Sequence, residues 1–149
     1  MDLGSLGDWG SLVLGSKNVA QACAMAAIHA EMLHQGGEVR IVTEGRTTKL
    51  IHRFTGRLDV DPRQFILGTL AVLRKVPLMS GEPSAIRVHL QASRGRGDDA
   101  LEECLGPHIE TGAEYNMVEF DRGLLAAPLQ PLKDCLLYTS DAADDTPCV

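Results

Sequence analysis

The chain has 149 residues, which is enough for one domain with a sizeable core and short for two. Its formal net charge of −6 makes it a poor candidate for gripping the phosphate backbone of nucleic acids. No apolar run approaches the length of about 18 residues that crosses a membrane, and no basic region followed by an apolar stretch opens the chain. We therefore expect a cytoplasmic protein without a membrane partner.

The first 15 residues are rich in glycine. Three of these glycines are spaced by three positions and follow no strand, so they do not form the G-x-G-x-x-G pattern of a phosphate-binding loop. We expect a short helix or turn there instead, carrying Leu6, Trp9 and Leu12.

A longer helix is predicted between residues 18 and 33. Asn18 followed by Gln21 resembles a capping box, and apolar residues recur at helical spacing as far as Leu33. Gly36-Gly37 then supplies the stop. The apolar face of this helix is rich in alanine, so it can approach a sheet or another helix closely.

Two strand-like runs follow, at residues 38–43 and 47–54. Glu44-Gly45-Arg46 joins them, which predicts a hairpin. Alternation along the second run puts one set of side chains on each face of the strand. The two sets are Leu50, His52 and Phe54 on one face, and Lys49, Ile51 and Arg53 on the other.

The second half of the chain alternates helices and strands. Asp61-Pro62 predicts a helix start, with Asp as N-cap and Pro in the first helical position, and Pro77 ends the apolar stripe that follows. The remaining predicted elements are a strand at residues 85–91, a short helix from Asp98 or Asp99 to Leu105, and strands at 108–111 and 115–120 around a turn. Strands in hairpins with helices between them predict an α+β fold, with a mostly antiparallel sheet and helices packed on one face.

The last fifteen residues, CLLYTSDAADDTPCV, carry no periodic apolar pattern. Their composition is typical of a disordered acidic terminus. Reverse translation gives a sharper interpretation, because CLLYTS can be encoded by TGT CTC TTA TAC ACA TCT, the mosaic end of a transposase adapter used in sequencing. The next codons of that adapter give Asp-Ala-Ala-Asp. We therefore expect residues 135–149 to be a non-native, disordered tail and residues 1–134 to be the domain.

The stretch LGPHIETGAEYNMVEFDRGLLAAPL, residues 105–129, resembles the end of the N-terminal, arabinose-binding-like effector domain of AraC-type transcription regulators. Upstream, Leu6-Gly7-Asp8-Trp9-Gly10 resembles the opening of the first helix in that family. The family's order of motifs is matched by Leu105-Gly106, Thr111-Gly112-Ala113-Glu114, Asn116, Val118, Phe120-Asp121-Arg122, Leu124-Leu125 and Pro128-Leu129. The resemblance covers residues 4 to 134.

The resemblance implies a ligand-sensing regulatory domain whose partners are a small-molecule effector and a second copy in a homodimer. Members of the family also carry further helices at the N-terminus and continue into two helix-turn-helix units that bind DNA. Neither is present here, so the resemblance implies a fragment that contacts DNA only through a missing C-terminal domain. The adapter-like tail accounts for the missing C-terminal part. The alternative is a stand-alone small-molecule-binding or dimerisation module.

The reactive residues are not spaced as catalytic or metal-binding residues usually are. The four cysteines form no Cys-x-x-Cys pair, and Cys104 and His108 are separated by Gly106-Pro107, so they share no helical face. The five histidines are scattered. We therefore predict no enzyme, no catalytic residues, no metal site and no cofactor.

Effector binding needs an apolar cleft on which a few polar groups converge. The candidates are Trp9, which offers a flat apolar face, and His34, His52 and Arg53, which lie beside the junction of the long helix and the hairpin.

Overall fold

The structure is a computed structural model that describes residues 3–55, 62–93 and 101–130. One layer is a five-stranded mixed sheet whose strands lie in the order β1-β2-β5-β3-β4. Every neighbouring pair is antiparallel except β3 and β4, which run parallel. The strands are β1 (Gly37–Glu44), β2 (Thr47–Phe54), β3 (Ile86–His89), β4 (Ile109–Glu110) and β5 (Asn116–Asp121).

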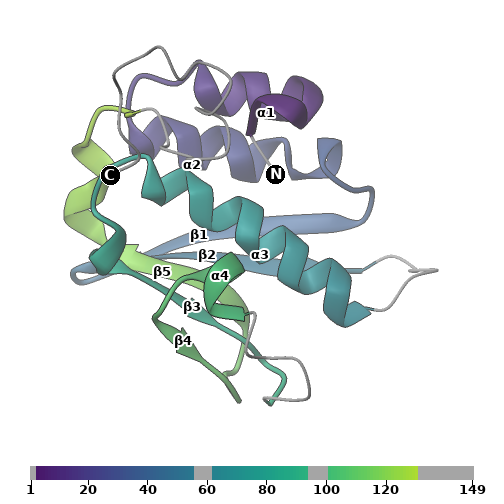
Figure 1. Cartoon of the computed structure of the whole chain (residues 1–149). Coiled ribbons are helices and arrows are strands. Elements are labelled where there is room, and N and C mark those ends of the chain that lie inside the picture. The colour runs from purple at the N-terminus through teal and green to yellow at the C-terminus, as the bar shows by residue number, and fades with distance from the viewer. Residues whose placement is uncertain (1–2, 56–61, 94–100, 131–149) are drawn as a thin grey trace, which may run out of the picture.

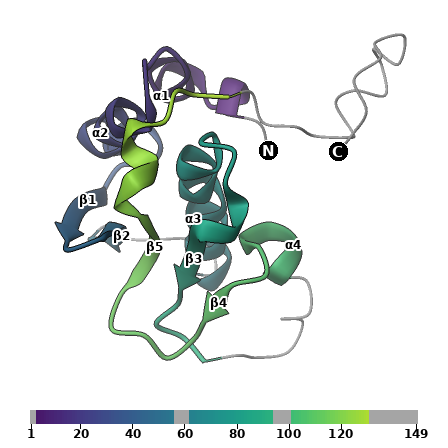
Figure 2. The same ribbon diagram turned by 90° about the vertical axis from the view of Figure 1, so that its left-hand side faces the viewer.

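The second layer consists of helices, and they all lie on one side of the sheet (Figures 1 and 2). This arrangement confirms the predicted α+β fold with helices on one face of a mostly antiparallel sheet. The α-helices are α1 (Gly7–Leu14), α2 (Val19–Ile28), α3 (Pro62–Leu78) and α4 (Leu101–Leu105). Short 3-10 turns are η1 (Leu3–Ser5), η2 (Ala30–Met32), η3 (Pro83–Ala85) and η5 (Arg122–Ala126).

The core lies between α3 and the three central strands. Leu50 on β2 is paired with Val118 on β5, which is paired in turn with Val88 on β3, and all three are 0% exposed. Leu70 and Leu73 of α3 are also fully buried. Each such side chain contributes about 1.5–3 kcal/mol by leaving water, so this contact between helix and sheet is a large contribution to the stability of the domain.

Helices α1 and α2 pack on each other beside this core. Trp9 is 0% exposed, and its indole Nε1 donates a hydrogen bond of 3.2 Å to the Ala26 carbonyl oxygen. The predicted N-cap is confirmed, because the Asn18 side chain accepts from the Gln21 backbone N–H at 2.8 Å. Leu12, expected to share the face of Trp9, is 37% exposed, and Val13 packs inward instead.

Helix α2 ends at Ile28, which is earlier than the predicted residue 33. The backbone hydrogen bonds there span three residues instead of four. Met32 N–H donates to the His29 carbonyl oxygen, and Leu33 N–H donates to the Ala30 carbonyl oxygen. This tighter 3-10 winding rotates the following residues away from the α-helical register.

The last two strands do not form the predicted hairpin. β4 pairs in parallel with β3, through hydrogen bonds from Val88 N–H to His108 and from Leu90 N–H to Glu110, and β5 lies between β2 and β3. The reason is burial, because β5 carries Met117, Val118 and Phe120, all buried, and needs a central position. The start predicted for the short helix, at Asp98 or Asp99, lies outside the described residues, as do Asp61 and the tail at 135–149.

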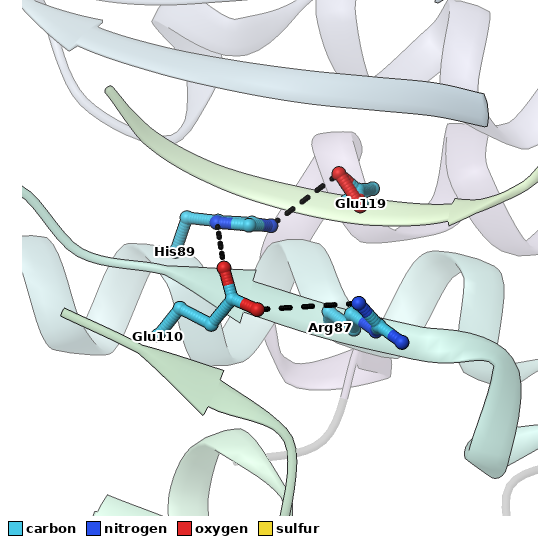
Figure 3. A network of polar contacts seen from close by, with 4 residues as sticks. All are labelled: Arg87, His89, Glu110 and Glu119. Atoms are coloured by element: carbon cyan, nitrogen blue, oxygen red, sulfur yellow. Dashed lines mark ion pairs between the residues drawn. The ribbon is translucent and has the colours of Figure 1, made fainter. Parts of the chain in front are cut away.

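On the face of the sheet that no described helix covers, side chains of opposite charge lie next to each other on neighbouring strands. Glu119 on β5 stands between Lys49 on β2 and Arg87 on β3. His89 lies beside this row, with carboxylate oxygens of Glu110 and Glu119 at 3.2 and 3.4 Å from its two ring nitrogens (Figure 3). Cross-strand pairs of opposite charge stabilise a solvated sheet face, so the charges fit a face that meets water.

Two glycine substitutions test the packing. A Cβ at Gly10 would stand 1.8 Å from the Leu3 carbonyl oxygen, whereas a Cβ at Gly68 on α3 would meet nothing within 4 Å. We expect Gly10→Ala to lower the free energy of unfolding by about 1–3 kcal/mol through overpacking. Gly68→Ala should raise it by about 0.5–1 kcal/mol through the better helix propensity of alanine. Urea unfolding of both variants measures the difference, and equal stabilities would contradict the α1–η1 contact.

Candidate functional site

Several elements converge at the end of the sheet where β2 stops and β5 begins. His52, near the end of β2, is directly paired with Asn116, the first residue of β5. β3 ends alongside and leads into Leu90, while the first turns of α3 lie above. Residues far apart in the sequence are therefore held side by side on the helix-covered side of the sheet.

Two histidines and two phenylalanines form an aromatic cluster at this end of the sheet. The His34 ring lies 4.5 Å from the ring of Phe65 on α3 and 5.2 Å from that of Phe54 on β2, measured between centroids. Phe54 and Phe65 are 5.0 Å apart, and His52 and Phe65 are 5.9 Å apart. Edge-to-face and tilted packing at these separations is favourable, so the rings fix one another in place.

His52 is the buried titratable member of this aromatic cluster, with 5% of its surface exposed. Burial lowers the pKa of His52, and the nearby His34 lowers it further, because a second positive charge close by is unfavourable. The imidazole is therefore neutral at neutral pH and carries one hydrogen-bond donor and one acceptor.

A small pocket of about 230 Å³ adjoins the aromatic cluster. Asn116, the register partner of His52, forms part of its wall, and so does Ile66, the residue after Phe65. The lining is mostly aliphatic, with one guanidinium and two amides. Its residues are Arg63, Ile66, Leu67, Leu90, Gln91, Ala92 and Asn116.

The two amides of the pocket are held in fixed positions. Asn116 Oδ1 accepts from the Gln91 backbone N–H at 2.9 Å, and Asn116 Nδ2 donates to Gln91 Oε1 at 3.1 Å. Gln91 Nε2 in turn donates to the Glu114 carbonyl oxygen at 2.8 Å. Each amide of this network still has hydrogen-bonding capacity left, so the wall is preorganised and can recognise a polar group.

The structure brings two of the four candidate residues together. His34 and His52 share the aromatic cluster beside the pocket, although neither lines the pocket itself. Trp9 is fully buried between α1 and α2 with its N–H bonded to Ala26, and it does not line the pocket. Arg53 is exposed and points to the opposite face of the sheet, where it stands across from Glu38.

The pocket also uses residues that sequence reasoning did not select. Ile66 belongs to the apolar stripe of α3 and looks like an ordinary core residue from its spacing, whereas its neighbour Leu67 lies outside that stripe. Asn116 gave one signal, because it is among the positions that match the family's order of motifs, but its polarity does not stand out in a strand that also carries Glu119 and Asp121. Only the pairing of distant strands reveals that it faces His52.

A second depression lies at the opposite end of the sheet. It has a volume of about 660 Å³ and lies between the start of α2, the β1–β2 loop and η5, with Asn18, Arg46 and Arg122 in its wall. It is wide and open, so a ligand there would stay hydrated. The smaller pocket encloses more of a ligand and is next to the neutral histidine, so we take it as the candidate site.

Two negative observations apply to the part of the chain that the structure describes. None of its helices combines the length and the apolar character that crossing a bilayer requires. No three His, Cys, Asp or Glu side chains within residues 3–55, 62–93 and 101–130 converge into a group that could hold a metal ion.

A small, mostly apolar pocket at one end of a helix-covered sheet has the form that binding of a small molecule requires. A family model described as the arabinose-binding domain of AraC transcription regulators, N-terminal, matches residues 1–129. The chain therefore belongs to this family of ligand-sensing domains in transcription regulation, which is not an enzyme family. A search of curated proteins found no match.

The burial of His52 predicts a specific dependence of stability on pH. Its pKa is lower in the folded chain than the ordinary value of 6.5, so the unfolded chain binds more protons below that pH. Stability should consequently fall as the pH drops below 6.5, and this fall should be smaller in His52→Phe. Urea unfolding at pH 7.5, 6.5 and 5.5 measures the free energy of unfolding. The control is His108→Gln, at an exposed position. An unchanged pH slope in His52→Phe would show that this imidazole does not resist protonation.

Proposed function

We propose that the effector of this sensor domain binds in the pocket under α3, which lies next to the cluster of His34, His52, Phe54 and Phe65. The observation that carries the proposal is the mostly apolar, half-open pocket whose wall contains the fixed Asn116 amide, the cross-strand partner of the buried His52. Trp9 and Arg53, the other two candidates, are supported by no contact with this pocket.

The size and lining of the pocket indicate what kind of molecule fits. Its volume of about 230 Å³ is below the range of about 300–1,000 Å³ that holds drug-sized ligands. Ile66, Leu67 and Leu90 favour an apolar body, and Asn116 and Arg63 favour a polar or anionic end. The effector proposed here is therefore a small organic molecule that combines the two.

Helix α3 offers a route from the pocket to the rest of a regulator. Arg63, Ile66 and Leu67 line the pocket from its first turns, and Met79 follows directly after its last residue. The Met79 carbonyl oxygen accepts a hydrogen bond of 2.8 Å from Gln130 N–H, in the segment that leads onward along the chain. A ligand that shifts α3 would move this segment, provided that it binds the two positions of the helix with unequal affinity.

DNA contact in this proposal belongs to a helix-turn-helix domain that follows residue 134 in the intact regulator. A long, adapter-trimmed read of the source DNA through the codon of Asp134 tests this point. We expect the open frame to continue into two helix-turn-helix units. If the frame itself encodes CLLYTSDAADDTPCV, a stand-alone binding module becomes the better account.

Filling the pocket should abolish effector binding. Leu67→Trp places an indole in the pocket from the α3 side, whereas Leu14→Trp adds the same group at a position on α1 that is 46% exposed. Thermal unfolding is measured for the chain with a panel of small carboxylic acids, alcohols and L-arabinose. A compound that raises the melting temperature of the unchanged chain should also raise that of Leu14→Trp but not that of Leu67→Trp. Equal stabilisation of both variants would place the effector elsewhere.

A further inference from the structure

The open depression between the start of α2, the β1–β2 loop and η5 contains two arginines that lie side by side. Arg122 N–H donates a hydrogen bond of 2.7 Å to the Arg46 carbonyl oxygen. This bond follows directly on the last register pair of β2 and β5, which is Thr47 and Asp121. The backbone therefore holds Arg46 opposite Arg122 where the pairing of the two strands stops, and both residues line the depression. We call this surface the arginine depression.

The two arginines face each other without a counter-charge. Like charges opposite each other on neighbouring strands repel and lower the stability of a sheet. Within residues 3–55, 62–93 and 101–130, neither Arg46 nor Arg122 forms an ion pair with a carboxylate. Asp121 also lines the depression, where its Oδ1 accepts a hydrogen bond of 2.7 Å from Gly123 N–H. An anionic group placed between the two guanidinium groups would replace their repulsion by charge-assisted hydrogen bonds.

The N-terminus of α2 adds a hydrogen-bond donor to the same wall. Val19 N–H donates to the Ala127 carbonyl oxygen, and Gln21 N–H donates to the Asn18 side chain. Ala20 N–H, between these two, has no acceptor among the described residues, and Ala20 lines the depression. A free N–H in the first turn of a helix favours an anion, so it acts in the same sense as the two arginines.

The shape of the arginine depression favours a protein segment over a small anion. Its volume of about 660 Å³ is far larger than a single phosphate or carboxylate group, and a small anion in so open a site would stay hydrated. Leu125 and Ala126 give the depression an apolar side. We propose that it is a docking surface for an extended acidic segment of a partner protein. The carboxylates of the segment lie between Arg46 and Arg122, and a neighbouring aliphatic side chain packs on Leu125 and Ala126.

The charges around the arginine depression disfavour a nucleic acid as the occupant. The formal net charge of the chain is −6, and carboxylates stand near both arginines in the sequence, Glu44 before Gly45-Arg46 and Asp121 before Arg122. A phosphate backbone carries a negative charge on every nucleotide and would be repelled by these carboxylates. A peptide that combines acidic and neutral residues can place its carboxylates at the arginines alone.

The arginine depression adjoins the segment that leads out of the described domain. Asn18, in its wall, forms an isolated bridge with Pro128. A partner bound there would therefore lie against residues 127–130, at the end of the sheet away from the effector pocket. The two sites share no lining residue, so this proposal does not depend on where the effector binds.

Titration of the complete, isotopically labelled chain with a synthetic peptide tests the docking surface. The probe is the acetylated peptide GSEELEESG, and its uncharged control is GSQQLQQSG. The acidic peptide should give saturable NMR shifts centred on the amides of Ala20, Arg46 and Arg122, and the control peptide should give none. Arg46→Glu and Arg122→Glu should each weaken binding about tenfold, because each turns an attraction into a repulsion.

Two further variants separate a local effect from one of net charge. Arg53→Glu makes the same charge change at an exposed position on β2, outside the depression, and should leave binding unchanged. The double variant Arg46→Glu, Arg122→Glu should instead bind the basic peptide GSKKLKKSG, which the unchanged chain should not bind. Circular dichroism of each variant ensures that only folded chains are compared.

Four outcomes would overturn the proposal. The first is the absence of saturable shifts with the acidic peptide up to millimolar concentration. The second is equal weakening by Arg53→Glu. The third is equal shifts with free glutamate at the same concentration of carboxyl groups, which would assign the surface to small anions only. The fourth is a short DNA duplex that shifts the same amides at lower concentration than the peptide does.

Discussion

The packing of α3 on the apolar face of the sheet is the contact on which the rest of the structure depends. Leu70, Leu73 and Val76 are fully buried there, above the row formed by Leu50, Val118 and Val88. The same contact sets the height of the first turns of α3 above the end of the sheet. The pocket exists because the side chains under these turns do not fill the space between helix and sheet.

The candidate site lies in this packing, but its buried histidine lowers the stability of the fold in acid. A neutral, buried His52 is a residue that the core accommodates at the expense of stability in acid, as the direction of its pKa shift shows. A phenylalanine beside the ring of Phe65 would not carry that cost, because it has no charged form. A polar residue in such a place is easier to understand when it has a ligand to recognise.

The sequence predicted local features well. The hairpin followed from alternation in residues 47–54 and from Gly45, and the Asn18 cap followed from its spacing to Gln21. These features depend on contacts between residues that are close in the chain. The junction of helix and hairpin that suggested His34 and His52 is likewise a local feature, whereas their role in effector binding stays a prediction.

Features that depend on long-range pairing could not be predicted. The place of β5 between β2 and β3 depends on which strands bury their side chains most completely, and adjacency in the chain suggested a hairpin with β4 instead. The partnership of Asn116 with His52 and Gln91 follows from this strand order. Trp9 was selected for its chemistry, but its spacing could not reveal that α2 would cover its ring completely.

The account is tested most directly by locating a bound ligand within the domain. Backbone amide and histidine NMR signals would be followed while the isotopically labelled chain is titrated with a small-molecule extract of the source cells. The account predicts shifts centred on Leu90, Asn116 and the rings of His34 and His52. Shifts centred on Arg46 and Arg122, or on the exposed face around Arg53, would contradict it.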